Sequence, residues 1–291
     1  MKNLLKFVAA LLLLASSAHA QSTWNGNAND GIWGTSGNWL GGTPGANTDA
    51  IIPAGLVGKP YPTVDFSANC RTLTIQGGSL TINSDADLTI NLSTAGVTAL
   101  SNSGLLTVNG LLAVSGNVVN NGTIVGGPVT ATNPNDGLVQ FDNTATATLS
   151  GTGTTSLTNV TFSATSNMVF ATNNKVNIGR IVRLRGRNWA TGDKVLLTSS
   201  ASTTGTSGMV DDAQAGSTIT GNISVERAIN GSFNSNDGYR HYSTPVRQPK
   251  FSDMAVTGVA PAAFTPRINS TYAYPATTNL VVQQLNFTGN G

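Results

Sequence analysis

The stretch "GLLTVNGLLAVSGNVVNNGTIVGG", from Gly104 to Gly127, repeats one short pattern. Each copy has two or three apolar residues with a small polar residue between them, followed by Gly or Asn-Gly. Repetition at this scale is typical of one structural unit that is stacked many times. Stacked units build a surface rather than an enclosed reaction centre, so we expect the sequence to say more about architecture than about a ligand.

Similar runs continue on both sides of this stretch, among them "RTLTIQGG", "SLTINSDADLTI" and "LTNVTFSA". In Leu73-Thr74-Ile75 the two aliphatic residues point one way and the threonine points the other, which is the alternation of a half-buried strand. Helix formers are scarce, since Glu226 is the only glutamate of the chain, whereas β-branched residues are plentiful. The composition therefore predicts an all-β protein.

Many short strands separated by turn residues fit either an antiparallel sandwich or a parallel β-solenoid. The strand-like runs recur roughly every ten to fifteen residues and resemble one another, which favours stacked coils of roughly 20 to 25 residues. We therefore predict a right-handed parallel β-helix. Asn120 supports this fold, because asparagines at the corners of stacked strands can form ladders through their side-chain amides.

The N-terminal segment has the features of a secretory signal peptide. Lys2 and Lys6 precede an apolar run from Phe7 to Ala15. The small residues after this run end in Ala18-His19-Ala20, an A-x-A cleavage site, so residues 1–20 form the predicted signal and cleavage is expected after Ala20. The apolar run is shorter than the roughly 20 residues that span a bilayer. We therefore expect a secreted or cell-surface location and no transmembrane segment after the signal is removed.

Charge argues against a nucleic-acid partner. Without Lys2 and Lys6 the chain has 15 − 2 = 13 basic residues against 13 acidic ones, and only 10% of the whole chain is charged. A nucleic-acid binder needs a basic face to displace counterions from phosphates. The single cysteine, Cys70, excludes an intramolecular disulfide and is expected to be a small buried hydrophobic residue. We expect no cofactor.

Residues 21–63 are predicted to form an N-terminal cap and the first coil. Trp24, Trp33 and Trp39 lie among glycines and asparagines. They could form an aromatic platform for sugar rings, but the large area that each ring can bury favours a cap over the end of the stack. The segment "NGNANDG", Asn25 to Gly31, is weakly similar to a calcium loop; its single carboxylate, Asp30, favours a hydrogen-bonded turn instead and no metal site.

The β-helix itself is predicted over residues 64–228. From about residue 230 tyrosines and prolines replace the glycine-punctuated triplets, so residues 229–291 are predicted to be a linker and a smaller β module. His241 lies in this module and is the only histidine after the signal. Ser243 falls on the same side of the same strand, which is not how a catalytic triad is presented, so we interpret His241 as a surface or interface residue.

Two segments carry a family resemblance. The spacing W-N-G, W, N-W, G-x-x-P and then Ile52-Pro53, together with "ITGNISVERAINGSFNSNDGYRHYSTPV" at residues 219–246, resembles secreted β-helix surface proteins of Bacteroidota and adhesin-like proteins. The resemblance implies an adhesin-like surface protein exported by type IX secretion. Relatives of this kind end in a C-terminal sorting domain, whereas this chain ends at "LNFTGNG"; the resemblance thus implies a truncated chain or a different export route.

The strongest cluster of charge is "GRIVRLRGRNW", residues 179–189. Arg183, Arg185 and Arg187 alternate with aliphatic residues or glycine, so we predict that they project from one face of one strand. Such a stripe could bind the carboxylates or sulfates of an acidic glycan. The alternative is a solvated face whose charges prevent edge pairing.

Two functions remain open. The first is a non-catalytic secreted or cell-surface protein with a structural or adhesive role, whose partner is a polysaccharide or the extracellular matrix. The second is a β-helix enzyme that degrades polysaccharide, a lyase or a glycoside hydrolase, which would need carboxylates that converge on one groove; Asp85, Asp87 and Asp142 are the residues to compare. We favour the first and nominate no catalytic residue, because few side chains could move protons at neutral pH.

Overall fold

The structure, a computed structural model, describes residues 19–226 except 93, 95, 129–132, 134, 164–166, 200–206 and 212–215. All of these belong to the first of two compact units, Met1–Gly238, and the second unit is Tyr239–Gly291. The predicted signal peptide up to residue 18 lies outside the described residues. So does the predicted C-terminal module at 229–291, with His241.

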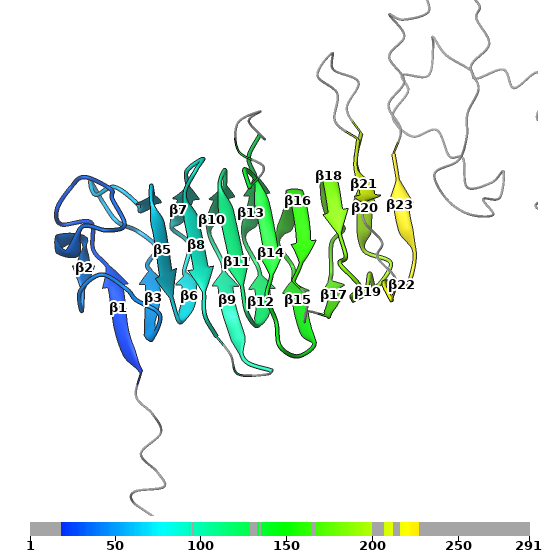
Figure 1. The fold of residues 1–291 in the computed structure, drawn as a ribbon. Coiled ribbons are helices and arrows are strands. Elements are labelled where there is room, and N and C mark those ends of the chain that lie inside the picture. Colours follow the sequence, from blue (N-terminus) through cyan, green and yellow to red (C-terminus); the bar gives the residue numbers. More distant parts are fainter. Residues whose placement is uncertain are drawn as a thin grey trace, which may run out of the picture. The chain divides into compact units, whose positions relative to one another are not determined.

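The described residues form a parallel β-solenoid of 23 strands, with one short 3-10 turn, η1 (Ser36–Asn38). The strands stack side by side in successive coils (Figure 1). All strand pairs are parallel except the first, β1 with β2. The parallel β-helix prediction is thereby confirmed, and the antiparallel sandwich is excluded for this part of the chain.

The coils have three faces. The first face is a ten-stranded sheet, which in spatial order contains β2 (Trp39–Leu40), β1 (Ala20–Trp24), β3 (Thr48–Ile52), β6 (Thr72–Ile75), β9 (Thr98–Asn102), β12 (Asn117–Asn120), β15 (Ala147–Gly151), β17 (Met168–Thr172), β19 (Asn188–Ala190) and β22 (Thr218–Thr220).

The other two faces belong to one 13-stranded sheet, because β16 (Thr154–Phe162) and β18 (Val176–Arg183) each run across the corner between them. The second face also contains β4 (Thr63–Val64), β7 (Ser79–Ile82), β10 (Leu105–Val108), β13 (Thr123–Gly126), β20 (Val195–Leu197) and β23 (Ile223–Val225). The third face also contains β5 (Ser67–Cys70), β8 (Asp87–Ile90), β11 (Leu111–Val114), β14 (Leu138–Phe141) and β21 (Met209–Asp211).

The repeated stretch at 104–127 forms a compact coil. Its strands β10, β11, β12 and β13 begin every six residues, and Leu105 pairs with Thr123, 18 residues further on. Neighbouring coils are longer: Ser79 pairs with Leu105, 26 residues on, and Thr123 pairs with Thr154, 31 residues on. The extra residues lie in connections at the corners, so coil length varies while the strand registers are kept.

Alternation along each strand places one set of side chains inside the coils. Leu80, Leu106 and Ile124 are register neighbours on the second face, and all are buried. Further along, aromatic rings fill the interior: the centroids of Phe162 and Trp189 are 5.9 Å apart. Such close edge-to-face and tilted contacts add to the stabilisation that burial of the rings provides.

Two kinds of residue make the corners compact. A Cβ atom on Gly122 would lie 2.1 Å from the carbonyl oxygen of Gly104, so only glycine allows these backbones to stack. Beside this corner the buried Asn102 donates from Nδ2 to Oδ1 of Asn120 at 2.8 Å, and Asn120 donates to Oγ1 of Thr155 at 2.9 Å. The expected asparagine ladder is confirmed.

Candidate functional site

The arginine cluster occupies a corner of the solenoid rather than one strand. β18 ends at Arg183, and β19 begins only at Asn188. Arg185 and Gly186 adopt left-handed backbone angles of φ 47° and 77°, and the Arg187 amide donates to the Leu184 carbonyl at 3.0 Å, which closes a turn. The prediction that all three arginines project from one strand is therefore wrong, because the glycine within the alternating pattern lets the chain turn.

Arg183, Arg185 and Arg187, hereafter the arginine corner, differ in their surroundings. Nε of Arg183 lies 3.6 Å from Oδ2 of Asp211, and 36% of the Arg183 side chain remains exposed. Arg185 is exposed. Nε of Arg187 is buried and has no hydrogen-bond partner. Within the described ranges, the Arg183–Asp211 pair is the one ion pair found for these three arginines. The guanidinium groups of the corner therefore keep N–H donors that this ion pair does not use.

Positive charge is concentrated in the coils around β18, although Lys175 and Lys194 lie at a different corner from the arginines, just before β18 and β20 begin. Of the lysines and arginines that the structure describes, only Lys59 and Arg71 precede this part of the stack; the others are Lys175, Arg180, Arg183, Arg185, Arg187 and Lys194. Asp193 is the one acidic residue between Lys175 and Lys194. Clustered charges of one sign raise the local concentration of oppositely charged ligands.

The three head tryptophans form a buried cluster. Trp24, Trp33 and Trp39 are 1%, 0% and 4% exposed. Trp39 stacks edge-on against both of the others, with ring centroids at 5.0 Å from Trp24 and 4.7 Å from Trp33. Since the ring faces are covered, they are not available to a sugar ring in this arrangement. The cluster instead packs against the core at the N-terminal end of the stack, where β2 is the outermost strand of the first face. This position agrees with the interpretation of the three tryptophans as a cap.

The Asn25–Gly31 segment is a hydrogen-bonded turn. The Asp30 carboxylate accepts from the Ile32 amide at 2.9 Å, from Oγ1 of Thr35 at 2.7 Å and from Nδ2 of Asn38 at 2.6 Å. The Ile32 bond is the largest cause of a lowered Asp30 pKa, and the bonds from Thr35 and Asn38 also contribute. The turn thus employs both carboxylate oxygens.

Cys70 is fully buried in β5, as expected for a small hydrophobic residue. Burial raises the pKa of its thiol far above the ordinary value, and the nearby Asp49 charge adds to the effect. The thiol therefore stays protonated at neutral pH, which makes it a poor nucleophile.

The three carboxylates that we compared do not meet. Asp85 lies in the corner before β8, Asp87 is the first residue of β8, and Asp142 follows the last residue of β14. β8 and β14 are separated by β11. Phe141 lies in the row of Ile90, and Asp142 lies one residue beyond it, at the other end of the third face from Asp87. At ~3.3 Å per strand residue and ~4.8 Å per strand, Asp87 and Asp142 are roughly 15 Å apart. These residues therefore do not form a pair of facing carboxylates.

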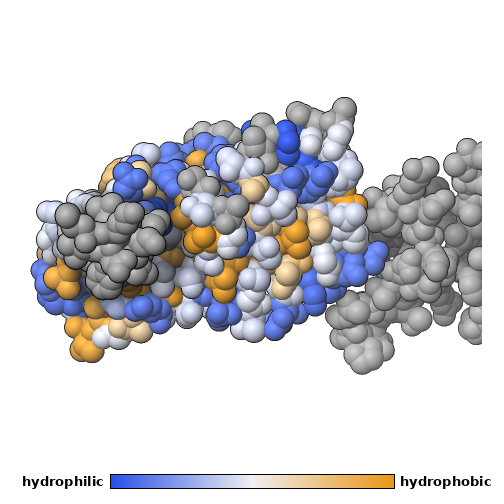
Figure 2. All heavy atoms as spheres, turned by 90° about the horizontal axis from the view of Figure 1, so that it is seen from below, coloured by the Kyte–Doolittle hydropathy of each residue, from blue (hydrophilic) through white to orange (hydrophobic). Residues whose placement is uncertain are grey.

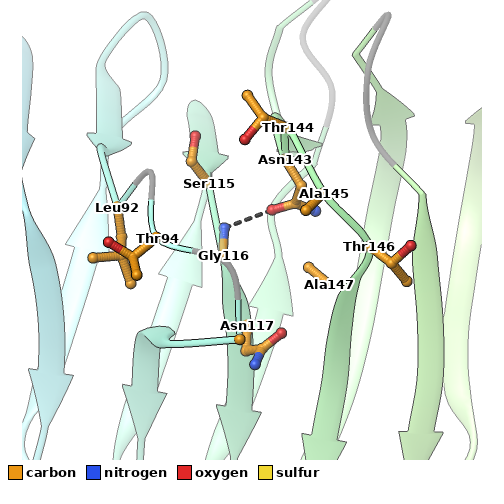
Figure 3. Close-up of a pocket in the computed structure, with 11 residues that line it drawn as sticks. Leu92, Thr94, Ser115, Gly116, Asn117, Asn143, Thr144, Ala145, Thr146 and Ala147 are labelled. Carbon is orange, nitrogen blue, oxygen red and sulfur yellow. Dashed lines mark hydrogen bonds between the residues drawn. The ribbon is translucent and has the colours of Figure 1, made fainter.

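A small hollow opens between the third and first faces (Figure 3). It is lined by Leu92, Thr94, Gly96, Ser115, Gly116, Asn117, Asn143, Thr144, Ala145, Thr146 and Ala147. Asn143 accepts from the Gly116 amide at 2.5 Å, and its Nδ2 lies 3.0 Å from Sδ of Met168. None of the described lining residues is charged. This hollow could not be predicted from the sequence, because three connections that are distant in the chain form it.

Exposed large apolar residues are dispersed over the body. They are Ile32, Leu40, Val57, Phe66, Val97, Leu105, Met209 and Ile219. The face in Figure 2 shows hydrophobic areas interspersed with near-neutral and hydrophilic ones. Scattered exposed apolar residues are normal on a protein surface.

Comparison with protein-family models, with curated proteins and with solved structures gave no match. Among the described residues, no helix is long and apolar enough to span a bilayer.

Proposed function

We propose that this protein is a non-catalytic secreted or cell-surface protein with an adhesive role, which binds anionic polysaccharide through its arginine corner. The observation that carries the proposal is the concentration of guanidinium groups at one corner, where Arg185 is exposed and Arg183 is paired only at 3.6 Å with Asp211. The location rests on the N-terminal sequence pattern, and export by type IX secretion rests on the family resemblance alone.

The chemistry of the corner suits carboxylates and sulfates. A guanidinium group has five donors in a planar fork, which matches the two oxygens of such an anion. Each contact at an exposed site contributes little, so several must act together. Pairing within the stack can hold several guanidinium groups close together. β18 pairs with strands of the coils on both sides, and this pairing fixes the position at which the arginine turn begins.

Chromatography on an immobilised acidic polysaccharide such as alginate tests the proposal. The wild-type chain should be retained at low salt and released as salt rises, since exposed charges are screened. The triple variant Arg183→Ala, Arg185→Ala, Arg187→Ala should elute at clearly lower salt while its circular dichroism stays β-rich. The matched control, Lys59→Ala, Lys175→Ala, Lys194→Ala, removes the same charge elsewhere and should elute close to wild type.

Two results would contradict the proposal. Equal losses in both triple variants would mean that retention reports net charge rather than the corner. Release of reducing or unsaturated sugars from a polysaccharide by the purified protein, abolished by replacement of one aspartate, would identify an enzyme instead.

A further inference from the structure

An aspartate lies beside the arginine corner in the next coil of the stack. β21 pairs in parallel with the end of β18, which it follows along the stack in Figure 1, and the register sets Asp211 next to Arg183. Val182 is fully buried in the core, so Arg183 points out of the coil and Asp211 points the same way. The register neighbour of Arg183 on its other side, Thr161, is uncharged. Main-chain pairing therefore holds one carboxylate against one of the three guanidinium groups.

The contact between the Arg183 and Asp211 side chains is loose. Nε of Arg183 lies 3.6 Å from Oδ2 of Asp211, farther than the roughly 2.7–2.9 Å of a charge-assisted N–H···O bond. The two side chains are 36% and 50% exposed, and among the described residues no hydrogen bond to the Arg183 guanidinium is found. Exposed ion pairs contribute little to stability. An anionic group that forms a bidentate pair with Arg183 therefore gains more than the contact that it replaces.

The turn of the arginine corner is anchored independently of Asp211. The Gly186 amide donates to Oγ of Ser217 at 2.9 Å, and the Thr218 amide donates to the Arg187 carbonyl at 3.2 Å. Both bonds join the turn to the following coil, and neither involves the Asp211 side chain. The turn therefore keeps its place when that side chain moves, so the exchange of the Asp211 carboxylate for another anion requires only side-chain rotation.

We infer that Asp211 is an intramolecular competitor of the anionic ligand. Its carboxylate occupies the position beside Arg183 that a carboxylate or sulfate of the glycan takes in the complex, and it thereby lowers the affinity of the arginine corner. The inference rests on the proposed function of this corner. The exposed Arg185 accepts an anion directly, whereas Arg183 accepts one only by exchange. The displaced carboxylate is already half-exposed and returns to water at little cost.

Calorimetric titration of the full chain with alginate oligosaccharides tests the inference, in about 0.1 M salt, where a Debye length of ~10 Å screens distant charges. Asp211→Asn removes the competing charge and keeps the side-chain shape. The affinity should rise about two- to fivefold, which corresponds to the strength of an exposed ion pair. In an Arg183→Ala background the same substitution should raise the affinity much less, because the group with which Asp211 pairs is gone.

Asp65→Asn is the matched control. It makes the same substitution at an exposed position in the β4–β5 corner, near the N-terminal end of the stack. The affinity of this variant should stay close to that of wild type, because the lost charge is distant and screened. Asp211 is half-exposed, so Asp211→Asn should fold like wild type, and the midpoint of urea unfolding checks this.

Three results would overturn the inference and leave the proposed function in place. They are unchanged or weaker binding by Asp211→Asn, an equal gain in Asp65→Asn, and a gain from Asp211→Asn that persists in full without Arg183. In each case the wild-type chain still binds, and the triple arginine variant still loses binding. Absence of binding by both wild type and Asp211→Asn would instead refute the proposed function, and the inference with it.

Discussion

At the scale of single residues, alternation decides what lies inside the solenoid. Leu112 is 1% exposed, and its register neighbours Leu88 and Val139 are buried beside it. Two-residue periodicity in the sequence predicts this placement, because successive strand side chains point to opposite faces. The same rule fails at Arg185 and Arg187, where alternating residues belong to a turn. Periodicity describes local spacing and does not by itself locate the end of a strand.

Leu112→Asp should strongly destabilise the coils around β11. The substitution places an unpaired carboxylate in an apolar interior, so we expect a loss of more than about 4 kcal/mol in the free energy of unfolding. Thr107→Asp, at an outward position of β10, should change the free energy of unfolding by less than about 1 kcal/mol. Urea unfolding followed by circular dichroism measures both variants. Similar values for the two would contradict the assigned register.

Asp30→Asn should alter the pH dependence of stability. The pKa of Asp30 is held below its ordinary 3.8 by the bonds from Ile32, Thr35 and Asn38, so its contribution is complete above pH 3.8 and is lost as pH falls through the lowered pKa. The variant lacks this ionisation. Wild-type Tm should therefore fall more steeply than variant Tm below about pH 4, as measured by differential scanning calorimetry. Parallel curves would show that the Asp30 bonds do not favour its ionised form.

At the scale of elements, the strands follow from the sequence more directly than the sites do. Thr-Leu-Thr-Ile at β6 and Ser-Leu-Thr-Ile at β7 are recognisable as strands, and similar triplets make parallel stacking the natural arrangement. Contacts between corners are not visible in this way. Asp85 and Asp136 are 51 positions apart, and the coils between them vary in length, so no fixed sequence spacing links them.

Asn120→Ala should destabilise the first face through lost corner bonds. Asn120 accepts from Asn102 and donates to the Thr154 carbonyl and to Oγ1 of Thr155. Removal of its side chain leaves these buried groups unpaired, so we expect the free energy of unfolding to fall by about 1–3 kcal/mol. Asn121→Ala changes the adjacent, exposed residue and should cost less than about 1 kcal/mol. Chemical unfolding of both variants gives the comparison. A larger loss in Asn121→Ala would mean that the ladder contributes little.

At the scale of the described body, charge is distributed unevenly along the stack. The coils before β18 carry Asp30, Asp49, Asp65, Asp85, Asp87, Asp136 and Asp142 but only Lys59 and Arg71, whereas the arginine corner lies at the later coils. The sequence alone shows this segregation, because coils are stacked in chain order. It does not show that the arginines form a turn, since that depends on where β18 ends.

The direction of the hydrogen bonds has a mechanical consequence. In the parallel pairs from β3 to β23, every strand that is not at the end of its face is bonded to the coils before and after it, so these bonds run along the stacking direction. A pull along that direction opens bonds one rung at a time instead of shearing a whole sheet at once. A tether of this construction lengthens stepwise under load and dissipates work in each step, and its resistance depends on the weakest coil rather than on the total number of coils.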